Sequence, residues 1–452
     1  MPTTPPEPIP VLATVPAPVS LGEALRYWLK LGFISFGGPA GQIAMMHHEL
    51  VEKRRWISEH RYLHALNYCM LLPGPEAIQL AIYISWLLHG VRGAIVAGVL
   101  FFLPAFVLLS LLAGVYLAFG DLPAVQGLFY GIKPAVVAVV LFAAWRIGSR
   151  VLKNEVLFGI AALAFSGIFF FGIGFPWIVL TAAILGAIGG KVMPAKFRAG
   201  GGHGASNKTY GPALIDDHTP PPAHARFSWP KLALTVALFV AVWAVAMLAV
   251  QGVPSLADMG TFFTKAAFLT IGGAYAVLPY VYQGAVEHFG WLTGPQMMDG
   301  LALGETTPGP LIMVVTWVGY LGGVTKEVVA NPVLAGLAGA SVATFFTFLP
   351  SFLFILVGGP LVEATRGELH FTAPLTAITA AVVGVILNLA VFFAWHTFWP
   401  QATDAVPFAA PFDSFAVAVA IAAFVALFRY QVDIMKVIGA CALVGLSYTL
   451  LT

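Results

Sequence analysis

The chain has 452 residues and a formal net charge of +2, a balance that implies neither a nucleic-acid nor an acidic partner. Hydrophobic residues make up 59% of the chain and charged residues only 9%, against roughly 25% charged in an ordinary soluble domain. With a mean hydropathy of +0.89, this excludes a typical soluble enzyme and predicts a polytopic α-helical membrane protein. Cys69 and Cys441 lie in apolar surroundings and predict neither a disulfide framework nor a thiolate metal site.

The chain begins with a proline-rich segment, residues 1–19. It lacks a basic stretch followed by an apolar core, which a signal peptide would have. We therefore expect a disordered tail here.

A tandem duplication organises the rest of the chain. SLGEALRYWLKLGFISFGG at 20–38 lines up with SLADMGTFFTKAAFLTIGG at 255–273, which lies 235 residues later. The same spacing relates the Pro-Gly-Pro motif at 73–75 to the one at 308–310. Many identities at one spacing predict two homologous repeats, 20–192 and 252–452.

Each repeat is predicted to start with one segment broken by Gly-Gly and a second broken by Pro-Gly-Pro, followed by four long helices. The long helices are expected near 93–119, 123–148, 155–172 and 175–192, and near 332–359, 372–398, 411–428 and 434–451. Between the repeats lie a polar, Gly- and Pro-rich linker at 193–228, expected to be flexible, and an unpaired membrane span at 229–251.

Positive charges predict how the repeats are inserted. Lys and Arg favour the cytoplasmic side, and they cluster at 146–153, 191–198 and 429–436. These clusters agree if the linker and the N-terminus are cytoplasmic, span 229–251 inverts the second repeat, and the C-terminus is periplasmic. The broken segments either span the membrane or form re-entrant hairpins. Arms of about 15 residues reach only partway through a bilayer, which favours hairpins.

Broken helices predict an anion site. Membrane proteins tolerate interrupted backbone where it is buried or lines a cavity, and secondary transporters bind substrate at such breaks between inverted repeats. Helix starts present free amides and a partial positive charge to a ligand. The alternative is that the breaks are only kinks or packing sites. Candidate ligands in and near the breaks are Gly37, Gly38, Pro39, Gln42, Pro73, Gly74, Pro75, Gln79, Gly272, Gly273, Tyr275, Thr307, Pro308, Gly309 and Pro310.

Four ionisable residues in these segments are further candidates. The matched Lys30 and Lys265 would bind the anion, or would only extend towards the membrane interface. Glu76 and Glu305 beside the Pro-Gly-Pro motifs would carry a coupled proton, since a carboxylate repels an anion unless it is protonated. Alternatively, Glu76 would only stabilise its own helix start.

No metal site or cofactor is predicted. The histidines His47, His48, His60 and His64 have no spacing that suggests metal ligation, and interfacial placement is the simpler interpretation. Arg54 and Arg55 are most simply charges that fix the topology.

The motifs resemble the chromate ion transporter family in its long, two-domain form. FGGPAGQIAMMH (36–47), LPGPEAIQLAIYISW (72–86), FLTIGGAYAVLPYV (268–281) and TPGPLIMVVTWVGY (307–320) carry the resemblance over about residues 20–452. It implies a bacterial inner-membrane protein that exports chromate and confers chromate resistance, with sulfate as a related dianion. Many short-chain members carry histidine where this chain has Gln42, so a protonatable group at that position is not expected here.

Other functions are weighed against chromate export. The same architecture could transport sulfate or another oxyanion. An intramembrane enzyme would need a catalytic motif such as HExxH or G-x-S-x-G, and neither occurs. A non-transporting assembly protein would not need two breaks per repeat. We therefore expect no enzymatic activity, an oxyanion and the lipid bilayer as partners, and a homodimer as one arrangement to consider.

Overall fold

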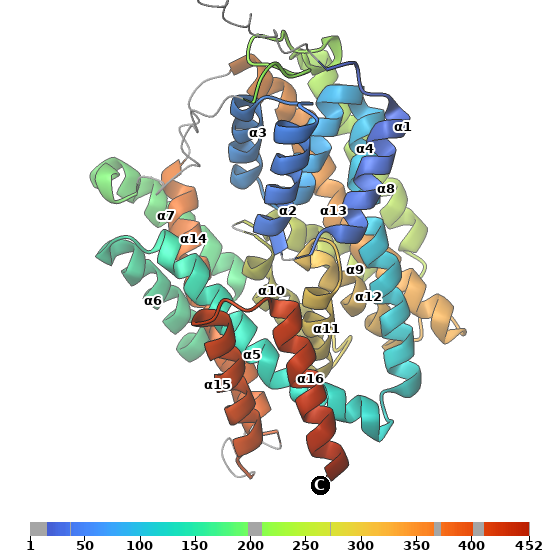
Figure 1. Ribbon diagram of the computed structural model, residues 1–452, viewed down its shortest axis with the longest axis vertical. Coiled ribbons are helices and arrows are strands. Elements are labelled where there is room, and N and C mark those ends of the chain that lie inside the picture. Colours follow the sequence, from blue (N-terminus) through green and yellow to red (C-terminus); the bar gives the residue numbers. More distant parts are fainter. Residues whose placement is uncertain are drawn as a thin grey trace, which may run out of the picture.

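The computed structural model describes residues 16–36, 38–197, 210–271, 273–365, 372–400 and 411–451, and these residues form helices joined by short connections (Figure 1). The helices of the first half are α1 (Leu21–Ile34), α2 (Gly38–His47), η1 (His48–Lys53), α3 (Glu59–Leu71), α4 (Glu76–Phe119), α5 (Pro123–Val151), α6 (Glu155–Phe171) and α7 (Phe175–Val192). Two short turns, η2 (Pro194–Lys196) and η3 (Ala223–Ala225), precede α8 (Trp229–Val250). The second half contains α9 (Pro254–Leu269), α10 (Ala274–Tyr282), η4 (Gln283–His288), α11 (Gly294–Thr306), η5 (Leu311–Met313), α12 (Val314–Thr325), α13 (Pro332–Thr365), α14 (Thr372–Phe398), α15 (Ser414–Phe428) and α16 (Ile434–Leu451).

Seven helices in the described part of the chain are long and apolar enough to cross a membrane: α4, α5, α7, α8, α13, α14 and α16. The helices α6 and α15 are equally apolar but shorter, with 17 and 15 residues. The prediction of an all-helical polytopic membrane protein is therefore confirmed.

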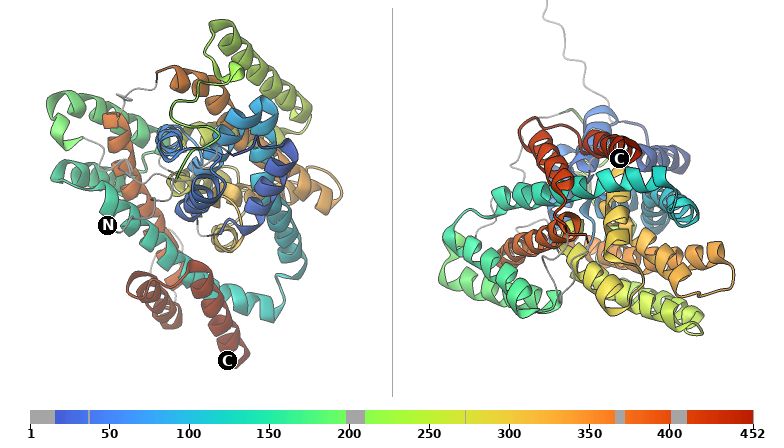
Figure 2. Two further views of the ribbon diagram at one scale, coloured as in Figure 1. Left: turned by 45° about the horizontal axis from the view of Figure 1, so that its top comes forward. Right: turned by 90° about the horizontal axis from the view of Figure 1, so that it is seen from below.

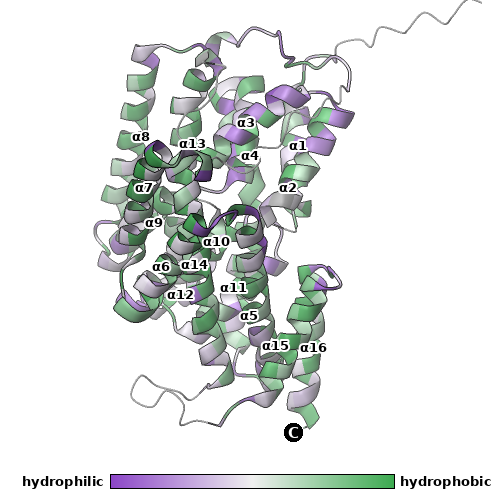
Figure 3. Ribbon diagram, turned by 90° about the vertical axis from the view of Figure 1, so that its left-hand side faces the viewer, coloured by the Kyte–Doolittle hydropathy of each residue, from purple (hydrophilic) through white to green (hydrophobic). Residues whose placement is uncertain are grey.

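Elements of the first half recur 235 residues later with nearly the same bounds. The π-helical turns η1 and η4 correspond residue for residue, and so do α3 and α11. Trp56 and Trp291, which follow the two turns, are both buried. Figures 1 and 3 place α1–α3 in the upper half of the molecule and α9–α11 in the lower half.

Two buried polar contacts join the halves. In the first, Arg61 Nη2 on α3 donates to a Glu363 carboxylate oxygen on α13 over 2.7 Å, and the Tyr83 hydroxyl donates to the other oxygen over 2.6 Å. In the second, the Tyr116 hydroxyl on α4 donates to Asp299 on α11 over 3.0 Å. Charges buried this deeply are tolerated because each has a partner.

The flexibility expected of the linker does not hold for residues 210–228. Leu214 and Ile215 donate backbone hydrogen bonds to the carbonyls of Arg55 and Trp56. The Ser58 hydroxyl donates to Asp217 over 2.5 Å. These bonds fix this part of the linker to the connection between η1 and α3. Composition alone missed this packing because Gly and Pro are equally common in ordered loops.

The helix α8 stands apart from the rest. It crosses the outer edge of the molecule beside α13 and α9 (Figures 1 and 2). None of its residues is buried against protein, although it is hydrophobic over most of its length (Figure 3). A helix with this pattern faces lipid on most sides.

Candidate functional site

The two Pro-Gly-Pro breaks meet at the ends of the first helices of the opposite halves. The Gly74 amide donates to the carbonyl of Thr270, which ends α9, over 2.6 Å. The equivalent Gly309 amide donates to the carbonyl of Ser35, which ends α1, over 2.9 Å. Both glycines have a positive φ, 120° and 114°, a backbone conformation that residues other than glycine rarely adopt. The breaks therefore lie together, and both amides are hydrogen-bonded within the protein.

Most of the polar side chains predicted to bind the anion hold backbone groups instead. Gln42 is fully buried and donates through Nε2 to the carbonyls of Ser35 (3.1 Å) and Gly309 (2.7 Å). Gln79, also fully buried, donates to the carbonyl of Pro73 over 2.6 Å. The Thr307 hydroxyl donates to the carbonyl of Gly304, one turn earlier in α11, and its neighbour Thr306 makes the same kind of bond.

We call the place where the two Pro-Gly-Pro breaks meet the opposite halves the crossing. A cavity of about 740 Å³ opens beside it. It lies between the starts of α2, α4 and α10, with α3 and α5 forming the other walls. Its volume is within the usual range of small-molecule sites. The predicted site residues that line it are Pro39, Glu76, Gly273 and Tyr275. Three of the four predicted helix starts therefore face one cavity, while Leu311 at the fourth is buried.

Two carboxyl groups lie on either side of the start of α10. Glu76 is the first residue of α4, and its Oε1 lies 3.8 Å from the position that a Cβ on Gly273 would take. The Tyr275 hydroxyl donates a hydrogen bond to the carboxyl group of Glu305, at the end of α11. Glu305 lines an adjoining cavity of about 490 Å³. The acids proposed for proton coupling thus belong to the same region as the helix starts.

The positive charge in the cavity comes from α5. Arg146 and Arg150 line both the main cavity and the adjoining one. Among the described residues, the Arg146 guanidinium has no ion pair and no side-chain hydrogen bond. Sequence reasoning treated both arginines as topology charges. The signal that could have identified Arg146 is its place within a predicted membrane helix, where a charged residue is a functional candidate by default.

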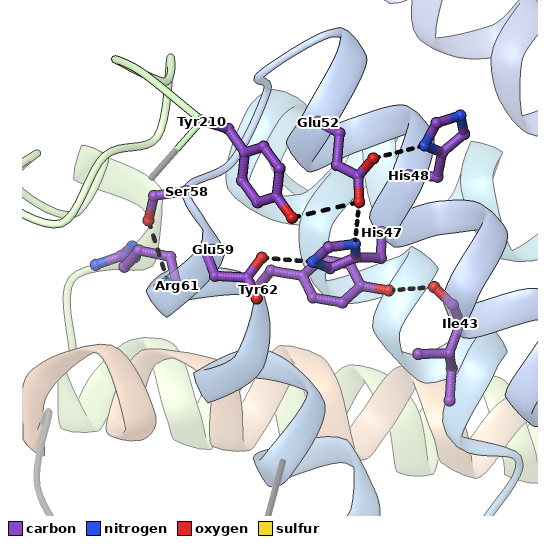
Figure 4. Close-up of polar contacts among 9 residues, drawn as sticks. All are labelled: Ile43, His47, His48, Glu52, Ser58, Glu59, Arg61, Tyr62 and Tyr210. Carbon is purple, nitrogen blue, oxygen red and sulfur yellow. Dashed lines mark hydrogen bonds and ion pairs between the residues drawn. The ribbon is translucent and has the colours of Figure 1, made fainter. Parts of the chain in front are cut away.

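The mouth of the cavity carries a network of paired acids (Figure 4). The His47 ring lies between two carboxyl groups: Nδ1 is 3.3 Å from Glu52, and Nε2 bonds Glu59. His48 donates to Glu52 as well, and this bond helps to hold the pKa of Glu52 below its usual value. Tyr210 of the linker reaches Glu52 over 3.4 Å. Glu52 and Glu59 are therefore both bonded to side chains at this end of the cavity.

The two lysines predicted as ligands do not line the cavity. The side chains of Lys30 and Lys265 are exposed on the outside of the molecule, a position that fits their alternative interpretation as interfacial residues. Gly37 and Gly272 lie outside the described residues.

Apolar spanning helices around a charged cavity, with interrupted helices meeting at its edge, define the class: a polytopic membrane protein with the construction of a small-solute transporter. The family model described as "Chromate transporter" matches residues 22–187 and 257–446. The chain belongs to the chromate transporter family.

Relatives with curated names cover most of the chain. A chromate transport protein of Cupriavidus metallidurans is 29% identical over 83% of this chain and 83% of its own length. One of Pseudomonas aeruginosa is 33% identical over 82% of this chain and 80% of its own. A probable chromate transport protein of Synechococcus elongatus is 28% identical over 82% and 84%. No solved structure matches the chain significantly.

Proposed function

We propose that the protein is a secondary transporter that exports chromate, a tetrahedral dianion, from the bacterial cytoplasm. The observation that carries the proposal is Arg146, which has no ion pair among the described residues and lines a cavity built from helix starts in a member of the chromate transporter family. A guanidinium and helix N-termini are the groups that bind oxyanions. Sulfate has the same charge and shape, so sulfate transport is the second candidate.

The cavity would open towards the cytoplasm. The basic clusters at 146–153 and 429–436 lie around it, and such clusters favour the cytoplasmic side. Residues 210–228 of the linker lie at the end of the molecule opposite to the C-terminus (Figures 1 and 3). This supports a cytoplasmic linker, a periplasmic C-terminus and oppositely inserted repeats in the inner membrane.

Export of a dianion needs no ATP. A cytoplasm-negative potential favours expulsion by about 4.6 kcal/mol per 100 mV, at ~2.3 kcal/mol per charge. Glu76 and Glu305 would add proton coupling, since an anion at the start of α10 is repelled by either carboxylate and admitted when the acid is protonated. Chromate export by this route would lower the cytoplasmic concentration and give resistance.

The first test is chromate flux into or out of proteoliposomes under an imposed potential. Arg146→Gln should lower the flux at least tenfold, and Arg146→Lys should retain part of it because the charge remains. Arg92→Gln, which changes an exposed arginine outside the cavity, should leave the flux unchanged. Equal fluxes for Arg146→Gln and Arg92→Gln would refute the assigned site. Flux of sulfate without flux of chromate would show that the substrate is sulfate and not chromate.

Two further variants test the other assignments. Glu76→Gln should flatten the pH dependence of transport if this acid carries the proton, and an unaltered pH profile would remove it from that role. Lys30→Ala combined with Lys265→Ala should leave anion flux intact, because both lysines are exposed away from the cavity. A large loss of anion flux in that double variant would show that the two lysines take part in anion transport.

A further inference from the structure

A second cavity lies between α8 and the faces of α4 and α13, and it shares no lining residue with the cavity that contains Arg146. Its volume is about 750 Å³, and its walls are almost entirely apolar. Val91, Ile95 and Val99 of α4 and Phe352 and Leu356 of α13 form one side. The other side is formed by α8, none of whose residues is buried by protein. The groove is therefore accessible from outside the protein along α8.

One end of the groove is basic. Arg226 and Lys231 line it there, together with His224 and Ser228, and none of the described lining residues is acidic. Lys231 Nζ and His224 Nε2 bond the carbonyls of Ala223 and Trp86, which fixes this end to the core. Arg226 is exposed and forms no ion pair among the described residues.

The basic end coincides with a marker of the membrane interface. Trp229 begins α8 and is 72% exposed, and tryptophan concentrates at the level of the lipid headgroups. From Ser228 to Val242, the groove follows 14 residues of α8, or about 21 Å at ~1.5 Å per residue. One leaflet of hydrocarbon is about 15 Å thick, so an acyl chain can lie along the groove while its headgroup stays at the basic end.

We propose that this groove binds an anionic phospholipid. The phosphate contacts Arg226 and Lys231 and faces the amide-bearing start of α8, and the acyl chains pack between α8 and the apolar faces of α4 and α13. Charge complementarity selects an anionic lipid over a zwitterionic one, and the apolar groove beside the N-terminal half of α8 provides the space for the chains. The lipid thereby joins the linking helix to the core of the transporter.

The test is native mass spectrometry of the full-length protein mixed with phosphatidylglycerol or phosphatidylcholine of identical chains. The unmodified protein should retain phosphatidylglycerol about tenfold better. Arg226→Ala with Lys231→Ala should abolish this preference, whereas Lys191→Ala with Lys436→Ala, two exposed lysines outside the groove, should preserve it. Equal retention of the two lipids by the unmodified protein would overturn the proposal.

Three additional experiments test what occupies the groove. Val99→Trp fills the groove on the α4 side and should reduce retention of both lipids, with thermal unfolding as the check that this variant is folded. Glycerol phosphate, which has no acyl chains, should not displace the lipid; displacement would show that only a surface phosphate site exists. Efficient disulfide cross-linking of Leu238→Cys between two copies in lipid would assign the groove to a second copy and contradict the proposal.

Discussion

The two halves of the molecule share a frame and differ in the residues that face the anion cavity. Gly74 and Gly309 have the same conformation and make equivalent bonds to the opposite half. By contrast, Glu76 corresponds to a buried leucine, Leu311, and Glu305 corresponds to Met70. The matched glycines therefore maintain the contact between the halves, whereas the two acids proposed for proton coupling have no acidic counterpart in the other half. The predictions below test this division by stability measurements.

The largest effect is expected at the two polar contacts between the halves. Glu363→Gln leaves the Arg61 guanidinium buried without a counter-charge, which should destabilise the protein by about 3–5 kcal/mol. Asp299→Asn should cost only about 1 kcal/mol, because Tyr116 can still donate to the amide oxygen. Thermal unfolding in detergent measures both. Equal losses would show that the two interfaces are equivalent after all.

The crossing glycines come next. Gly74→Val and Gly309→Val force a β-branched residue into a left-handed conformation, and a Cβ would lie 2.5 Å from Gln79 Nε2 or 2.8 Å from Ala105 Cβ. Each should lose about 2–3 kcal/mol of stability.

The two losses should be similar, because the two positions are matched. Thermal unfolding measures both losses. The prediction is wrong if one variant keeps its stability and the other does not. Gly22→Val at an exposed position with no close neighbour serves as the control.

A smaller effect is expected at Gln42, which corresponds to Val277 in the second half. Gln42→Val removes hydrogen bonds to the carbonyls of Ser35 and Gly309, so the cost should be about 1–3 kcal/mol. Anion flux per folded molecule should stay close to normal, since Gln42 does not line the cavity. A folded variant that has lost transport would make Gln42 a ligand, as the sequence suggested.

The smallest effect concerns the loop that the linker covers. The pKa of Glu52 is lowered in the folded protein by the hydrogen bond and charge of His48. Its stabilising contribution is therefore complete above its ordinary pKa and is lost as the pH falls from that ordinary value through the lowered one. Hydrogen exchange of residues 48–58 should increase in that window. Glu52→Gln should show no such increase, and an identical rise in this variant would exclude Glu52 as the cause.

Sequence reasoning identified the frame better than the site. Hydrophobic runs and the 235-residue spacing are local or repeated signals, so the helices and both sets of breaks were predictable. The crossing bonds between Gly74 and Thr270 and between Gly309 and Ser35 join residues that are remote in sequence, and no local pattern shows them. Lys30 was chosen as a candidate because it is duplicated in the second half. Arg146 was not chosen, although α5 brings it to the cavity.

The reciprocal bonds at the crossing have a mechanical consequence. Each loop caps a helix of the opposite half, so withdrawing one loop exposes a carbonyl that belongs to its neighbour. Uncapping costs on the order of 1 kcal/mol for each bond lost, and either half resists moving alone. Any rearrangement that opens the cavity to the opposite side of the membrane should therefore rotate both pairs of broken helices as one rigid body. The helix α5 and its arginines would then shift relative to that body.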